Sequence, residues 1–121
     1  MHESKQQLLA HRVQDCHQLF AWIIPQLDKM PRLRRYTLGE RLETILLQVL
    51  ENLIEASYTK SSTNVLKRAN LKLDTARHLW RLARTLEAVS VKSYSEGAEQ
   101  MVALGRQIGG WRKAASSANR G

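Results

Sequence analysis

Cysteine is nearly absent from the sequence. Cys16 is its only one, so no disulfide within the chain holds the fold together. Two prolines and six glycines provide few turn signals, and aromatic residues make up only 6% of the chain. These shortages exclude a disulfide scaffold and disfavour a β-rich fold, which needs many turns and aromatic strand residues. The 121 residues are long enough for one domain, 1–121, with its own hydrophobic core.

Long hydrophobic runs are also missing. The most apolar patch, LFAWIIP at 19–25, is too short to cross a bilayer. The polar start MHESKQQ lacks the hydrophobic centre of a signal peptide. Because the chain also has a lone cysteine, we expect a cytoplasmic protein that does not act at a membrane.

Positive charge is present in excess and is unevenly distributed. The formal net charge is +8, and residues 1–58 contain as many acidic as basic residues. Residues 59–121 hold twelve Lys or Arg against four acids, so the second half carries the whole excess. Such asymmetry indicates a nucleic acid or an acidic protein as partner. The alternative is that the charge serves solubility alone.

Apolar residues recur at intervals of three and four along four segments, which predicts four helices. We expect them at about 4–27, 38–58, 64–88 and 91–113, followed by a disordered tail at 114–121. Short connections between long helices favour antiparallel neighbours. The sequence therefore predicts an all-α fold, an up-down-up-down antiparallel four-helix bundle. The second helix is apolar over a wide arc, which makes it the best candidate for a subunit interface.

Capping signals mark two of the predicted helix starts. In the run KMPRLRRYTLGERLE, residues 29–43, Thr37 and Glu40 form a T-x-x-E capping box behind a basic, proline-marked loop. At the fourth helix, either Ser90 or Ser93 can cap, and Ser93 with Glu96 matches a second capping box. A basic loop at the start of a capped helix suits an anionic partner.

A one-signed stripe on the third predicted helix is the clearest polar feature. At 100° per residue, Arg77, His78, Arg81 and Arg84 fall within an arc of about 120°, where Asp74 is the only acid. Like charges at this spacing repel unless a partner neutralises them. Phosphates would do so and release condensed cations, so the stripe favours nucleic acid over the alternative of a merely solvated face.

We therefore expect basic residues from three parts of the chain to contact a nucleic-acid backbone. Little reading of bases is expected, because few exposed aromatic residues are available for stacking. The expected contacts are Arg32, Arg34 and Arg35 in the first connection, Arg41 on the second helix, Lys67, Arg68, Lys72, Arg77, Arg81 and Arg84 on the third, and Arg106, Arg112 and Lys113 on the fourth.

No pattern of catalytic or metal-binding residues is recognisable. The four histidines are scattered, and the neighbours Cys16 and His17 point about 100° apart on a helix. Cys16 lies on an apolar stripe and is expected to be a small buried side chain. We expect no catalytic residues, no metal site and no cofactor, so the chain is not predicted to be an enzyme.

Three glycines lie inside the fourth predicted helix, where each costs up to ~1 kcal/mol relative to alanine. They are Gly105, Gly109 and Gly110. Close helix–helix approach is the favoured explanation, because Ile108 and Trp111 continue the apolar period through them. The alternative is a simple helix break before the tail.

Four segments in a fixed order resemble one protein family. They are Pro31 with the basic run into YTLGER at 36–41, LIEA at 53–56 with Tyr58, L-x-RANLKL at 66–73, and GR-x-x-GGW at 105–111. In this order and spacing the chain resembles the accessory variability determinant (Avd) family of diversity-generating retroelements. More distantly it resembles the four-helix-bundle proteins encoded by intervening sequences in bacterial 23S ribosomal RNA genes.

The resemblance implies a four-helix bundle that assembles as a ring-like homopentamer with a basic surface. Members of the family bind RNA or DNA and the reverse transcriptase of the element, have no catalytic activity, and support mutagenic copying of a template RNA. The alternatives are a protein–protein adaptor whose basic face docks on an acidic patch, an intervening-sequence-type bundle protein of unassigned role and, more weakly, a small bundle enzyme or metal protein.

Overall fold

The computed structural model describes residues 5–120, with side chains at 11 and at 13–117. All secondary structure in this range is helical, which confirms the predicted all-α class. The elements are α1 (Lys5–Asp28), α2 (Arg32–Arg34), a π-helical turn η1 (Arg35–Gly39), α3 (Glu40–Tyr58), α4 (Thr63–Thr85) and α5 (Val91–Arg120).

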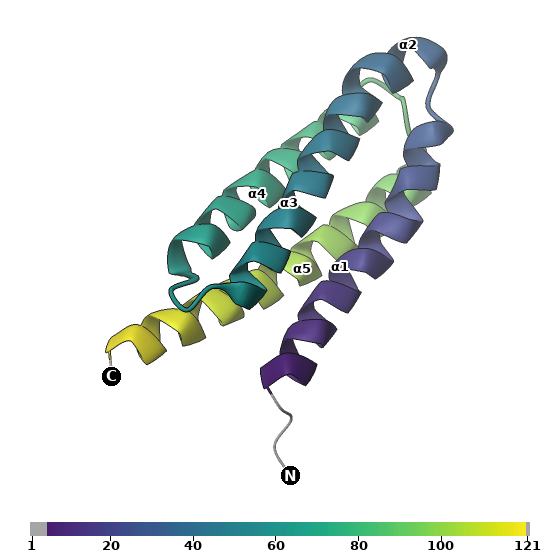
Figure 1. Cartoon of the computed structure of the whole chain (residues 1–121). Helices are drawn as coiled ribbons and strands as arrows, with labels where there is room; N and C mark the ends of the chain where they lie inside the picture. The colour runs from purple at the N-terminus through teal and green to yellow at the C-terminus, as the bar shows by residue number, and fades with distance from the viewer. Residues whose placement is uncertain (1–4, 121) are drawn as a thin grey trace.

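The four long helices run antiparallel to their neighbours in chain order (Figure 1). α3 packs against α1 and α4, and α5 packs against α4 and α1, so the helices enclose one core. This is the predicted up-down-up-down four-helix bundle. The core is filled by aliphatic side chains from all four helices and by Trp80, which is fully buried. None of the described helices is long and apolar enough to cross a membrane.

The predicted basic loop before α3 is in fact helical. Pro31 adopts φ −51° and ψ 142°, and its carbonyl accepts the Arg35 N–H at 2.9 Å, so helical structure begins directly after it. Thr37 has helical backbone within η1, and its Oγ1 donates to the Leu33 carbonyl at 2.9 Å. The predicted T-x-x-E capping box is therefore wrong, because no N-terminal N–H group is left at that position for Thr37 to cap.

The ends of α4 and the start of α5 differ slightly from the sequence pattern. α4 ends three residues earlier than predicted, since Glu87 takes a left-handed backbone with φ 59°. Of the two candidate caps for α5, Ser90 is the one used: its Oγ accepts the Ser93 N–H at 3.1 Å. Ser93 does not form the predicted box, and its hydroxyl lies 3.2 Å from Gln26 Oε1 on α1.

The predicted disordered tail is helical as far as it is described. α5 continues without a break through Arg120, where a helix end near residue 113 was expected. Ala114, Ala115 and Ala118 are strong helix formers, and no glycine or proline interrupts the segment before Gly121. Residue 4, the expected start of the first helix, and residue 121 lie outside the described residues.

Candidate nucleic-acid interface

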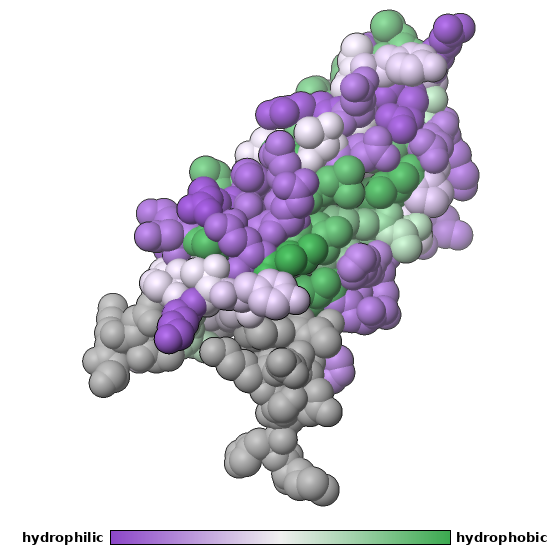
Figure 2. All heavy atoms as spheres, in the orientation of Figure 1, coloured by the Kyte–Doolittle hydropathy of each residue, from purple (hydrophilic) through white to green (hydrophobic). Residues whose placement is uncertain are grey.

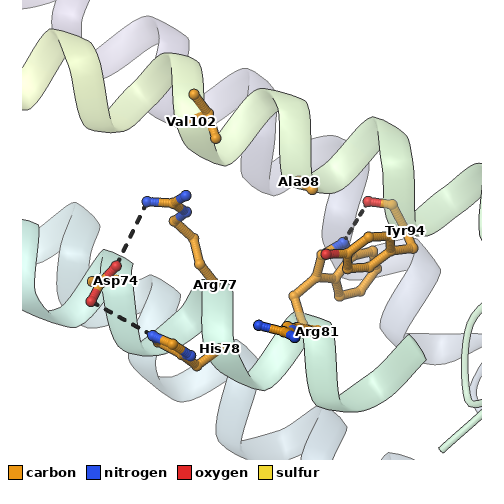
Figure 3. Close-up of a pocket in the computed structure, with 8 residues that line it drawn as sticks. Asp74, Arg77, His78, Arg81, Tyr94, Ala98 and Val102 are labelled. Carbon is orange, nitrogen blue, oxygen red and sulfur yellow. Dashed lines mark hydrogen bonds and ion pairs between the residues drawn. The ribbon is translucent and has the colours of Figure 1, made fainter. Parts of the chain in front are cut away.

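A groove between α4 and α5 contains the best-defined basic site in the described structure. It consists of two adjoining hollows, of about 230 Å³ and about 320 Å³, which share Asp74 and Arg77. The smaller hollow is lined by Asp74, Arg77, His78, Trp80 and Arg81 from α4 and by Tyr94, Ala98 and Val102 from α5 (Figure 3). The larger one is lined by Lys67, Asn70, Leu71, Leu73, Asp74, Arg77, Gly105 and Arg112.

The cationic groups of this groove come from both helices and only partly cancel. Lys67, Arg77 and Arg81 follow one flank of α4 over about 21 Å, at 1.5 Å per residue. Arg112 of α5 lines the larger hollow together with Lys67 and Arg77. Asp74 lies among them, with one carboxylate oxygen 3.6 Å from Arg77 Nη1 and the other 3.9 Å from His78 Nε2. The four cations against one carboxylate leave the groove with an excess of positive charge, without counting His78.

The floor of the smaller hollow is aromatic and tightly held. Trp80 Nε1 donates to the Tyr94 carbonyl at 2.9 Å, and the two rings stack at 17° with centroids 6.5 Å apart. Trp22 of α1 meets the other side of this pair in an edge-on contact with Trp80. A Cβ at Gly97 would lie only 2.7 Å from Trp80 Nε1, so the absence of a side chain there lets the indole reach α5.

Close packing at the other glycines of α5 is not observed. A Cβ at Gly105 would be 3.7 Å from Leu73 Cδ2, an ordinary contact, and Gly109 and Gly110 face open space within 4 Å. The predicted close approach at these three positions is therefore wrong. The close approach occurs at Gly97, which the sequence did not single out, although its helical spacing from Met101 and Leu104 indicates the buried face of α5.

Two of the predicted contact residues are engaged in holding the fold. Arg84 Nη1 donates to the Val89 carbonyl at 2.7 Å and so closes the turn between α4 and α5. Arg35 bridges two elements: its Nε is 3.2 Å from Asp28 at the end of α1, and its Nη2 is 3.5 Å from Glu43 on α3. Neither guanidinium lines the groove.

The remaining predicted residues lie outside the groove. Arg68 leans toward α3, where its Nη2 is 3.6 Å from Glu55. Arg32 lies 5.9 Å above the Tyr36 ring at the end of the bundle formed by α2 and η1 (Figure 1). The others that do not line either hollow are Arg34 and Arg41 near the start of α3, Lys72 on α4, and Arg106 and Lys113 on α5. The basic residues that were predicted to contact nucleic acid therefore lie on several different surfaces of the bundle.

Nucleophilic or metal chemistry has little support among the described residues. Burial raises the pKa of the Cys16 thiol from 9.0 to about 12 by desolvation, which leaves it protonated at neutral pH. No group of three or more His, Cys, Asp or Glu side chains is placed to hold a metal ion within the described part of the chain. The structure offers charged and aromatic contacts instead.

Comparison with known proteins matches the chain to a family model. The family model described as bAvd-like matches residues 8–115, which include all the residues of the α4/α5 groove. No curated protein and no solved structure matches the chain.

Proposed function

Since the chain belongs to the bAvd-like family, we propose that it is a non-enzymatic accessory protein of a diversity-generating retroelement. In this function it binds RNA or DNA through the α4/α5 groove, binds the reverse transcriptase of the element, and supports mutagenic copying of the template. Family membership supports the accessory function in general. The nucleic-acid partner is supported by one observation, the convergence of Lys67, Arg77, Arg81 and Arg112 on a single groove.

The chemistry of these four side chains suits a phosphate backbone. Arginine forks match phosphate oxygens with paired hydrogen bonds, and lysine adds a mobile point charge. The surface pair of Arg77 with Asp74 is half exposed and worth little, so a phosphate can replace it. Backbone contacts of this kind position a nucleic acid and carry little sequence information.

The first test is the salt dependence of binding. Four neutralised phosphates predict that affinity for a single strand falls about 50-fold between about 50 mM and about 200 mM salt, since each releases condensed counter-ions. Fluorescence anisotropy of a labelled oligonucleotide measures how the affinity changes with salt concentration. The control repeats the measurement at the same salt concentrations with a different anion. Absence of binding at low salt, or tight binding that ignores salt, would contradict the proposal.

We also propose that the protein acts as a homo-oligomer, a ring-like pentamer. Two exposed apolar stripes support this. On α3, the side chains of Leu47 and Ile54 are 41% and 42% exposed. They lie on the same face of α3 as Glu43, and this face is turned toward α1, because Glu43 pairs with Arg35 and Arg35 also pairs with Asp28 at the end of α1. Figure 2 shows an apolar band on the face formed by α1 and α3.

The second stripe runs along α4 beside the α4/α5 groove, whose larger hollow Leu71 also lines. Leu71, Leu82 and Leu86 are 68%, 44% and 41% exposed, and Leu79 lies half-buried in the same helical row. Two different apolar patches on one chain fit a head-to-tail interface, which closes into a ring when the rotation allows. Both stripes would be buried if the α3 stripe of one copy packed against the α4 stripe of the next copy.

Charge inserted into a stripe is expected to dissociate the oligomer. Leu82→Glu would bury an unpaired carboxylate in the interface, so we expect light scattering to show a monomer where the unsubstituted protein is an oligomer. Leu33→Glu is the matched control, because Leu33 is 68% exposed at the end of the bundle and belongs to neither stripe. A strictly monomeric unsubstituted protein would refute the oligomer proposal.

A further inference from the structure

The smaller hollow of the groove differs from the rest of the basic surface in having an aromatic wall. Tyr94 is half-buried, so part of its ring stays accessible where it lines the hollow. Its other surroundings hold it still: the ring stacks on Trp80, and its carbonyl accepts the Trp80 Nε1–H. A ring fixed in this way loses little freedom when a ligand stacks on it.

Apolar groups lie on one side of this hollow and cationic groups on the other. Ala98 and Val102 continue the α5 wall, while Arg77 and Arg81 project from α4 on the other side (Figure 3). The volume of about 230 Å³ is many times the roughly 10–15 Å³ that one water molecule needs on the same measure, so the hollow has room for more than a small ion. An inorganic anion would use the arginines but leave the aromatic and apolar wall without a function.

A planar, apolar ring attached to an anion would use both halves of the hollow. Nucleotides have this chemistry, because a base stacks on aromatic side chains while its phosphate pairs with arginine. In a duplex the bases are stacked inside the helix, so only unpaired nucleotides can place a base against Tyr94. An acidic peptide would match the arginines alone.

We propose that this hollow is a binding site for an unpaired nucleobase, which stacks on Tyr94 while Arg77 and Arg81 hold the flanking phosphates. The inference rests on the proposed nucleic-acid function and narrows it to single-stranded or looped RNA or DNA. It also revises the expectation of little contact with bases, which was based on the small number of aromatic residues in the sequence.

The test compares three probes matched in phosphate number: a single strand, an abasic strand of the same length, and a duplex of two strands that are each half as long. The unsubstituted protein is expected to bind the single strand about tenfold more tightly than the other two, the size of one base–aromatic stacking contact. Ala98→Leu fills the hollow from its wall and should remove this preference, because it should weaken binding of the single strand about tenfold more than binding of the duplex and the abasic strand. Circular dichroism confirms that the variant is folded.

Ala103→Leu is the matched control, because it adds the same side chain to the same helix but in the hollow between α1 and α5. This variant should keep the full preference for the single strand. Equal affinity of the unsubstituted protein for all three probes, or equal weakening of all three by Ala98→Leu, would overturn the inference and leave the proposed function standing. Absence of binding to any probe at low salt would refute both.

A second measurement does not depend on a variant. A single strand carrying 5-iodouracil, irradiated while bound, should crosslink to the peptide that contains Tyr94, because the halogenated base then lies against the ring. Crosslinks confined to other peptides would place the bases elsewhere and overturn the inference.

Discussion

Reversal of two charges in the groove, Arg77→Glu/Arg81→Glu, is expected to weaken nucleic-acid binding by at least ~100-fold. Each arginine loses a charge-assisted contact with phosphate worth about 1.5 kcal/mol, and about 3 kcal/mol for the two corresponds to more than a hundredfold in affinity. The new carboxylates also repel the backbone. Both side chains are exposed, so the free energy of unfolding should change little. Fluorescence anisotropy with a single-stranded probe at low salt measures the loss.

The matched control is Lys29→Glu/Lys60→Glu, which changes the net charge by the same amount at exposed positions outside the groove. If the groove is the site, this control should lose far less affinity than the groove variant. Equal losses would mean that the protein attracts nucleic acid through its net charge alone. If the groove variant loses binding to the reverse transcriptase but keeps nucleic acid, the basic face is a protein-docking surface and the adaptor alternative is correct.

A methyl group at Gly97 is expected to lower the free energy of unfolding by about 1–3 kcal/mol, the usual effect of overpacking a core. In Gly97→Ala the new Cβ would lie 2.7, 2.8 and 2.9 Å from three atoms of the Trp80 indole. The indole has no easy way to move, since it is fully buried, contacts Trp22 edge-on and donates its N–H to the Tyr94 carbonyl. The gain of up to ~1 kcal/mol in helix propensity does not offset this.

Gly110→Ala is the control for Gly97→Ala on the same helix. A Cβ there meets nothing within 4 Å, so only the propensity term remains and the variant should be stabilised by up to ~1 kcal/mol. Urea denaturation at one protein concentration shows whether each variant has a lower or a higher free energy of unfolding than the unsubstituted protein. Near-ultraviolet circular dichroism reports whether Trp80 has moved. Two stabilised variants would show that the indole can shift without loss.

The two predicted helix starts show which features of a helix can be predicted from neighbouring residues alone. Ser90 was identified as a candidate cap for α5, because a serine side chain binds the N–H three residues on without help from the rest of the fold. The same reasoning failed at Thr37, where the capping pattern is present but the chain is already helical from Arg32 onward. Pro31 and the two ion pairs of Arg35 determine that start, and the ion pairs depend on α1 lying beside α3.

The basic residues show the same limit. Helical spacing predicts that Arg77, His78, Arg81 and Arg84 share one side of α4, because that depends only on the period of the helix. Spacing does not report what each side chain meets. Arg84 binds the Val89 carbonyl, and Arg77 shares the groove with Arg112 from α5, a residue 35 positions further along the chain.

The sequence by itself determined the all-α class, the number and approximate extent of the long helices, the family and the excess of positive charge. These follow from the period of apolar residues, from the order of short segments and from composition, none of which depends on how the helices pack. Only the tertiary structure decided which cations line one groove, that Tyr94 and Trp80 form its aromatic floor, and that Gly97 rather than Gly105, Gly109 or Gly110 permits the close contact. Those features depend on how α4 and α5 face each other, since contact distances between helices are set by the packing of the whole core.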